Sequence, residues 1–99
     1  MKGIFMSINA SKHYEQLPAS TDFGALRRLT REAYRDGFAF GVRDGMNGKL
    51  AGVKLTISEE YARTCNLPMK KCKAILLSYM RNGYNAGFIE GLMQLESEL

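Results

Sequence analysis

The sequence has 99 residues, 45% hydrophobic and 24% charged, with a formal net charge of +4, which is typical of one globular domain and excludes wholesale disorder. Its two cysteines and single histidine cannot form a metal-ligand cluster, so we expect no metal ion and no cofactor. The longest strongly apolar run, Ala74 to Leu77, is too short for a membrane span, and the first residues do not suggest a signal peptide, so we expect a cytoplasmic protein.

The first part of the chain, residues 1–20, shows only weak local patterns, and we interpret it as an arm that precedes a single helical domain over 21–99. Three residues at this boundary can cap a helix start, namely Ser20, Thr21 and Asp22. Apolar side chains then recur at helical spacing, so the sequence predicts a long helix over about 23–46. Asn47 and Gly48 end it.

The middle of the chain carries a strand-like pattern and then two helix starts. Apolar and polar residues alternate over 53–57, which permits a short strand. Ser58 followed by two glutamates predicts a short helix that ends near Cys65. The residue before Pro68 is pushed out of helical geometry, so a turn precedes a third helix that Pro68 opens. The predicted inward positions of this helix are Cys72, Ile75, Leu76 and Tyr79.

An internal repeat relates residues 34–46 to residues 80–92, which lie 46 positions later. Each copy carries glycine at every fourth residue, and this spacing places the glycines on one helix face. An interior helical glycine costs about 0.5–1 kcal/mol relative to alanine, so each stripe needs a compensating close approach of another chain segment. Two arrangements are open: the copies pack on each other within one monomer, or the stripes receive a second chain. The residues assigned to helix packing or a partner interface are Gly37, Phe38, Gly41, Gly45, Gly83, Tyr84, Gly87, Phe88 and Gly91.

These elements predict an all-α fold class, a compact helical domain with two long glycine-striped helices and one short helix. Whether the third helix ends at Gly83 or continues to about Leu95 is open. The charge of the chain is unevenly distributed. Between Leu26 and Arg81 there are twelve Lys or Arg residues and five Asp or Glu residues, and the segment after Arg81 carries only acidic residues. A basic body of this kind suits a polyanion or an acidic protein surface.

The segment 57–84 resembles the helix-turn-helix of winged-helix transcription regulators. The matching residues are Ala62 in the first helix, Asn66 and Leu67 at the turn, Pro68 opening the second helix, Cys72 and Ile75 at its buried positions, and Gly83 and Tyr84 ending it. In that family the second helix lies in the major groove. The resemblance therefore implies base-edge contacts from Met69, Lys70, Lys71 and Lys73 and phosphate contacts from Arg63 and Arg81. Possible auxiliary contacts come from three further residues, Arg27, Arg28 and Arg31. A helix that continues through Gly83 would remove the end of this motif and favour protein binding.

The glycine pattern is also similar to that of ribosome modulation factor and related small phage or bacterial proteins. This similarity rests on Gly83, Tyr84, Asn85, Ala86 and Gly87 and on the earlier copy of the repeat. It implies binding to the ribosome.

No residue pair suited to acid–base or nucleophilic catalysis stands out, because His13 lies in the arm, and surface capping and solubility explain Asp36 and Asp44. We therefore expect a non-enzymatic protein without a small-molecule substrate. The leading hypothesis is a DNA-binding regulatory protein that acts through helix 69–82 as a homo-oligomer. The alternative is a protein-binding inhibitor or adaptor of phage or mobile-element type, whose glycine-striped helices self-associate or dock on a larger protein or the ribosome.

Overall fold

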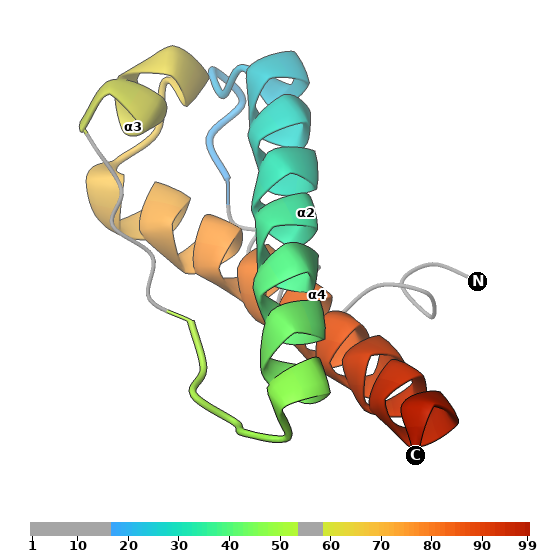
Figure 1. Ribbon diagram of the computed structural model, residues 1–99. Helices are drawn as coiled ribbons and strands as arrows, with labels where there is room; N and C mark the ends of the chain where they lie inside the picture. Colours follow the sequence, from blue (N-terminus) through green and yellow to red (C-terminus); the bar gives the residue numbers. More distant parts are fainter. Residues whose placement is uncertain (1–16, 54–58) are drawn as a thin grey trace.

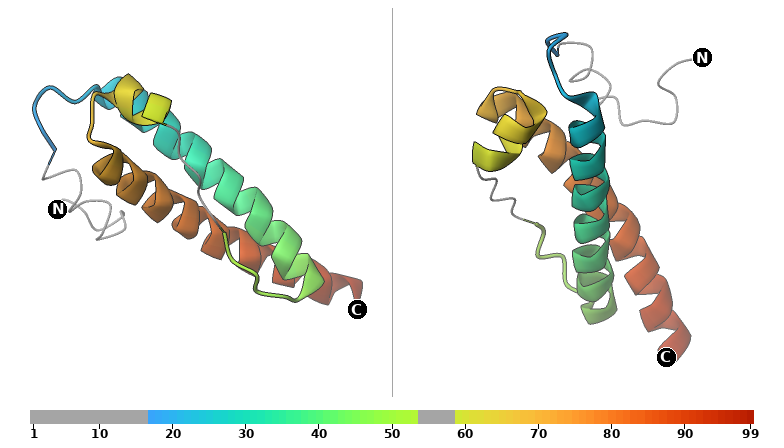
Figure 2. Two further views of the ribbon diagram at one scale, coloured as in Figure 1. Left: turned by 90° about the vertical axis from the view of Figure 1, so that its left-hand side faces the viewer. Right: turned by 90° about the horizontal axis from the view of Figure 1, so that it is seen from above.

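The computed structural model describes residues 17–53 and 59–99, and the described part of the chain folds into three helices. These are α2 (Phe23–Asn47), α3 (Glu59–Cys65) and α4 (Met69–Glu98). The two long helices lie side by side and run in the same direction, and α3 packs near their N-terminal ends (Figures 1 and 2). The predicted all-α fold class is confirmed. Of the strand-like segment 53–57, Val53 has no regular structure and the other four positions lie outside the described residues.

Helix α2 has the boundaries that its local signals predict. At its start the Asp22 carboxylate accepts a hydrogen bond from the Ala25 amide at 3.0 Å, which satisfies one of the free amides of the first turn. At its end Gly48 has a positive φ of 65°, and its amide donates to Gly45, while the Lys49 amide donates to Asp44. This paired pattern is a Schellman cap, for which glycine is the residue of choice because it has no Cβ.

Helix α4 does not end at Gly83. It continues unbroken to Glu98. The helix end that the helix-turn-helix resemblance implies at Gly83 and Tyr84 is therefore absent, and the helix predicted over 69–82 is sixteen residues longer than expected. Single interior glycines cost only about 1 kcal/mol each, which the packing against α2 described below offsets.

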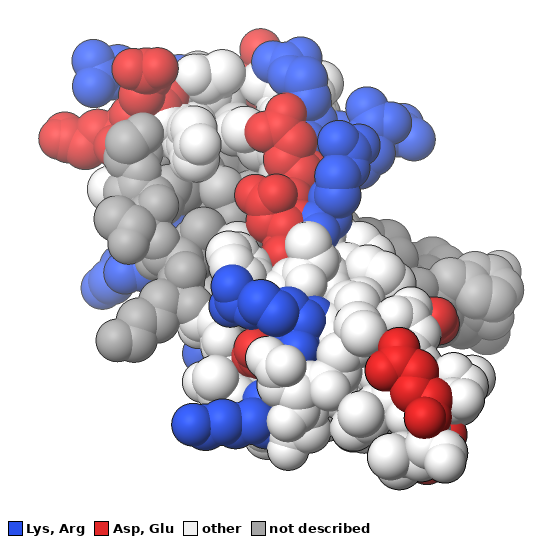
Figure 3. All heavy atoms as spheres, in the orientation of Figure 1, with Lys and Arg blue, Asp and Glu red and all other residues white. Residues whose placement is uncertain are grey.

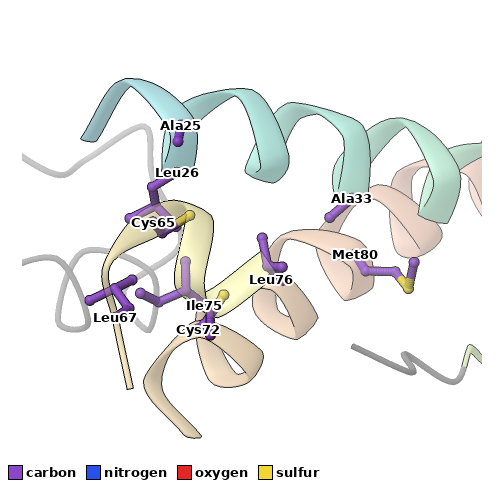
Figure 4. Close-up of a cluster of buried hydrophobic side chains, with 10 residues drawn as sticks. Ala25, Leu26, Ala33, Cys65, Leu67, Cys72, Ile75, Leu76 and Met80 are labelled. Atoms are coloured by element: carbon purple, nitrogen blue, oxygen red, sulfur yellow. The ribbon is translucent and has the colours of Figure 1, made fainter. Parts of the chain in front are cut away.

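The hydrophobic core lies at the N-terminal ends of the long helices, where all three helices meet. Leu26 of α2 and Ile75 of α4 are completely buried, as are both cysteines, Cys65 and Cys72 (Figure 4). Three of the four inward positions predicted for α4 are confirmed, and Tyr79 is only partly buried. The Phe40 side chain of α2 is 42% exposed, because glycines occupy the inner face at that level.

The two buried cysteines predict a loss of stability at high pH. Burial raises the pKa of Cys72 to about 11 and also raises the pKa of Cys65, because the core disfavours a thiolate. The unfolded chain ionises first, near the ordinary thiol pKa of about 8.5, so this contribution is complete below that pH and is lost as the pH rises towards about 11. In urea unfolding over this pH range, Cys72→Ala is expected to lose less stability than the wild type. Identical profiles would contradict this assignment.

Along the rest of their length α2 and α4 touch through their glycine stripes. A Cβ atom added at any of the six repeat glycines would overlap a backbone carbonyl oxygen of the facing helix. The glycine and carbonyl partners are Gly37 with Met80, Gly41 with Tyr84, Gly45 with Phe88, Gly83 with Tyr34, Gly87 with Phe38, and Gly91 with Val42. The two repeat copies therefore pack on each other within one chain.

These six contacts follow an approximate two-fold axis that runs between the helices. Gly37 faces the carbonyl of Met80, and the repeat-related Gly83 faces the carbonyl of Tyr34, which is the repeat counterpart of Met80. In each contact a glycine hydrogen points at a carbonyl oxygen, and such Cα–H···O contacts contribute about 0.5–1 kcal/mol each at helix interfaces. Six of them supply about 3–6 kcal/mol, which is of the same size as the helix-propensity cost of six glycines.

The two-fold relation decides which side chains share a surface. The helix pair has two grooves, and residues that correspond in the repeat lie in opposite ones. We call the groove that contains Phe38 of α2 groove A, and the groove that contains its counterpart, Tyr84 of α4, groove B.

Candidate functional site

The turn between α3 and α4 is a rigid, exposed element at one end of the molecule. Asn66 has a positive φ of 56°, and the amide of Leu67 donates to the carbonyl of Ala62 at 2.9 Å, so α3 ends in an asparagine version of the Schellman cap. The Asn66 side chain donates to the carbonyl of Ser20 at 3.0 Å, and the Asp22 amide donates to Cys65. These bonds fasten the turn to the start of α2.

The turn places some of the predicted nucleic-acid-binding residues together. Lys70 and Lys73 are exposed and three residues apart, so they share one side of the first turns of α4. Exposed Arg63 and Met69 line an open hollow at the same turn. Lys71 lies about 100° around the helix from Lys70 and is half-buried with an interaction of its own, so the three lysines do not form one surface.

The predicted auxiliary arginines lie elsewhere. Arg27 and Lys73 each lie seven residues before a copy of the repeat, so the two-fold relation, extended along the helices, places them in opposite grooves, with Arg27 and Arg31 along groove A. Exposed Arg28 lies two turns before Arg35 on nearly the same side of α2, and Arg81 of α4 follows Lys73 along groove B. Figure 3 shows basic side chains flanking one side of the upper part of the molecule, with acidic side chains immediately beside them. The structure thus divides the predicted cations between two faces.

Groove A contains a pocket that the sequence analysis did not single out. It is a hollow of about 430 Å³ between α2 and α4, lined by Thr30, Arg31, Tyr34, Arg35, Phe38 and Tyr79. Tyr34, Arg35 and Tyr79 were not among the candidate site residues. A sequence signal for them exists, because Arg31 with Arg35 and Tyr34 with Phe38 form two interleaved pairs at a spacing of four, which places both pairs on one side of the helix.

Groove B is closed by the chain itself. The Tyr84 hydroxyl donates a hydrogen bond of 2.6 Å to the carboxylate of Asp44, and it accepts one of 2.9 Å from the amide of Gly52. Tyr84 and Asp44 are only 4% and 6% exposed. Burial and the bond to Asp44 raise the pKa of Tyr84. Asp44, which the sequence analysis took for a surface acid, is therefore a structural residue that holds the 48–53 loop over the groove.

The described residues contain no cluster of three or more histidine, cysteine or acidic side chains that could bind a metal ion. Over the same part of the chain, no helix is both long and apolar enough to cross a membrane.

Comparison with known proteins adds no family to this picture. No protein-family model matches the chain, and no curated protein or solved structure matches it significantly. A proposal for its function therefore depends on the surfaces described above.

Proposed function

We propose that this chain is a small, non-enzymatic nucleic-acid-binding protein that binds duplex DNA through the α3–α4 turn. The observation that supports the proposal is the exposed side of the first α4 turns, where Lys70 and Lys73 lie together and Arg63 lies across the turn. The bonds from Asn66 to Ser20 and from Asp22 to Cys65 hold this basic surface in place. Because the backbone of the turn is already ordered, phosphate binding costs only the rotamer entropy of the exposed side chains.

The proposed surface differs from the one that the helix-turn-helix resemblance implies. Lys71 is left out of it because its side chain points to another side of α4, and Arg81 lies more than two turns farther along the helix. The contacts are therefore to the phosphate backbone, which positions a protein on DNA without identifying its sequence. The two buried, free cysteines fit a cytoplasmic protein, since thiols stay reduced there.

The proposal predicts the effect of removing Lys70 and Lys73. In a titration of labelled duplex DNA at several salt concentrations, log affinity should fall with log salt, with a slope of roughly −0.9 per phosphate contact. The double variant Lys70→Gln, Lys73→Gln should therefore have a slope shallower by about 2. A control variant, Lys49→Gln, removes an exposed cation beyond the other end of α2 and should keep the wild-type slope.

Two results would count against this function. An unchanged slope in the lysine variant would show that the α3–α4 surface is not the binding surface. Failure of the wild type to bind any duplex at about 50 mM salt, where non-specific binding is visible, would remove duplex DNA as the ligand.

Protein binding is the second candidate, and the continuity of α4 through Gly83 favours it. It would not use the glycine stripes, because these are covered within the chain. It would instead use the last turns of α4, where Ile89 and Met93 are 60% and 58% exposed and lie one turn apart. This candidate takes the place of the first if the duplex experiment fails.

A further inference from the structure

The two grooves of the helix pair are related by the approximate two-fold axis, but the side chains that line them differ. In groove B, Met80 and Tyr84 are 5% and 4% exposed, because the helices and the 48–53 loop cover them. Their repeat counterparts in groove A are Tyr34, which is 40% exposed, and Phe38, which is half-buried. Phe38 has no hydroxyl with which to fasten a loop as Tyr84 does. Groove A thus contains a pocket at the position where the 48–53 loop covers groove B.

The pocket in groove A combines flat apolar surfaces with positive charge. Three aromatic rings line it, those of Tyr34, Phe38 and Tyr79, and Arg31 and Arg35 lie at its edge one helical turn, about 6 Å, apart. Both arginines are exposed, and neither forms an ion pair with another residue in the ranges 17–53 and 59–99. No acidic residue is among the lining residues.

The acidic residues of α2 do not line this pocket. Asp36 points about 100° away from Arg35 around the helix. Glu32 lies three residues before Arg35 and is its neighbour on α2, so one acid stands against three arginines along this edge. Arg27 precedes Arg31 by one turn and adds a third cation along the same edge. The edge of groove A is therefore positive over more than two helical turns.

We propose that this pocket binds an unpaired base of single-stranded nucleic acid, with neighbouring phosphates on Arg31 and Arg35. Its volume of about 430 Å³ lies within the usual range of about 300–1,000 Å³ for ligand sites. Sequence-tolerant single-strand binding uses this combination of aromatic surfaces for bases and cations for phosphates. The inference rests on the proposed function for its class of ligand, but it uses the opposite groove and a different form of nucleic acid.

An acidic peptide would be attracted by the same arginines. Its carboxylates would bind the arginines at the edge of the pocket. It would have a planar group to stack on the three aromatic rings only where an aromatic residue follows an acidic one. Each nucleotide supplies both the flat group and the charge, so nucleic acid matches the whole lining. An oligonucleotide that keeps its phosphates and lacks its bases therefore distinguishes base recognition from binding by charge alone.

The test compares two labelled oligonucleotides of about ten residues, one of thymidine and one of the same length that is abasic. The full chain should bind the thymidine strand about tenfold more tightly, which is the scale of one stacked base. Tyr34→Ala should abolish this preference, and Tyr34→Phe should keep it. Replacing Arg31 and Arg35 together by glutamine should weaken the binding of both strands, whereas Lys49→Gln, an exposed cation beyond the far end of α2, should change neither by more than about twofold.

Equal affinity of the wild type for the two strands would overturn the inference, as would an unchanged preference in Tyr34→Ala. Tighter binding of an acidic, tyrosine-containing peptide than of the thymidine strand would overturn it in favour of a protein ligand. If Tyr34→Ala does not fold, the wild-type comparison of the two strands still decides whether bases are bound. The variant that lacks Arg31 and Arg35 then decides whether groove A binds them, because these exposed side chains leave the core unchanged. The Lys70→Gln, Lys73→Gln variant should keep the preference for bases, so loss of duplex binding and loss of base binding can be distinguished.

Discussion

Replacing Gly87 by alanine is expected to lower the free energy of unfolding by about 3 kcal/mol, the upper part of the usual range for an overpacked site. The added methyl would overlap the carbonyl oxygen of Phe38 and lie 2.9 Å from its carbonyl carbon. These are backbone atoms of α2, so no side-chain rotation can make room, and the helices must separate. Separation would weaken the other glycine contacts as well. Urea unfolding followed by circular dichroism would measure the loss.

Gly24 offers a matched control in the same fold. It lies in the first turn of α2, and a Cβ there would be 3.5 Å from the nearest atom, a carboxylate oxygen of Asp22, which is an ordinary contact. Gly24→Ala should therefore stabilise the protein by about 0.5–1 kcal/mol, because alanine is the better helix former. A neutral Gly87→Ala would mean that α2 and α4 do not approach as closely as the structure shows.

Removing the hydroxyl of Tyr84 has the second-largest expected effect. Tyr84→Phe leaves the buried Asp44 carboxylate without its 2.6 Å donor, and the Gly52 amide without its acceptor. Leaving the buried Asp44 oxygen without this donor costs about 1–3 kcal/mol, while Arg43, whose Nε lies 3.7 Å from the other carboxylate oxygen, remains beside it and the exposed Gly52 amide can bond to water. Urea unfolding at neutral pH should show this loss, and amide exchange should become faster at Gly52.

The pH dependence of stability provides a second test of the same assignment. Burial and the bond to Asp44 raise the folded-state pKa of Tyr84 above its ordinary value of about 10. The neutral hydroxyl therefore contributes fully below pH 10, and its contribution is lost as the pH rises through the raised value. The free energy of unfolding of Tyr84→Phe should therefore decrease less at alkaline pH than that of the wild type.

The repeat supplies the control for Tyr84 too. Phe38→Tyr places a hydroxyl at the corresponding position of groove A, where the pocket is open, and should change stability by no more than about 0.5 kcal/mol. If Tyr84→Phe proved equally neutral, the contact with Asp44 would contribute nothing to holding the 48–53 loop.

Much of the architecture could be predicted because it depends on residues that are close in the chain. The helix bounds near 23 and 46 follow from Asp22 as a cap and Gly48 as a stop, and both caps act within one turn of the helix. The turn at Asn66 and Pro68 was equally local. The grouping of cations was only partly predicted, although helical periodicity alone separates Lys71 from Lys70 and joins Arg35 to Arg31.

By itself the sequence determined the helices, the repeat and the need of each glycine stripe for a closely packed partner, because propensity, caps and periodicity are properties of short segments. Only the tertiary structure decided that each stripe is the other's partner, that α4 continues through Gly83, and that Asp44 is buried by a tyrosine 40 positions away. It also decided which groove is closed. These outcomes depend on contacts between distant segments, and the two-fold packing that assigns Arg27 and Lys73 to opposite faces exists only when both helices are in place.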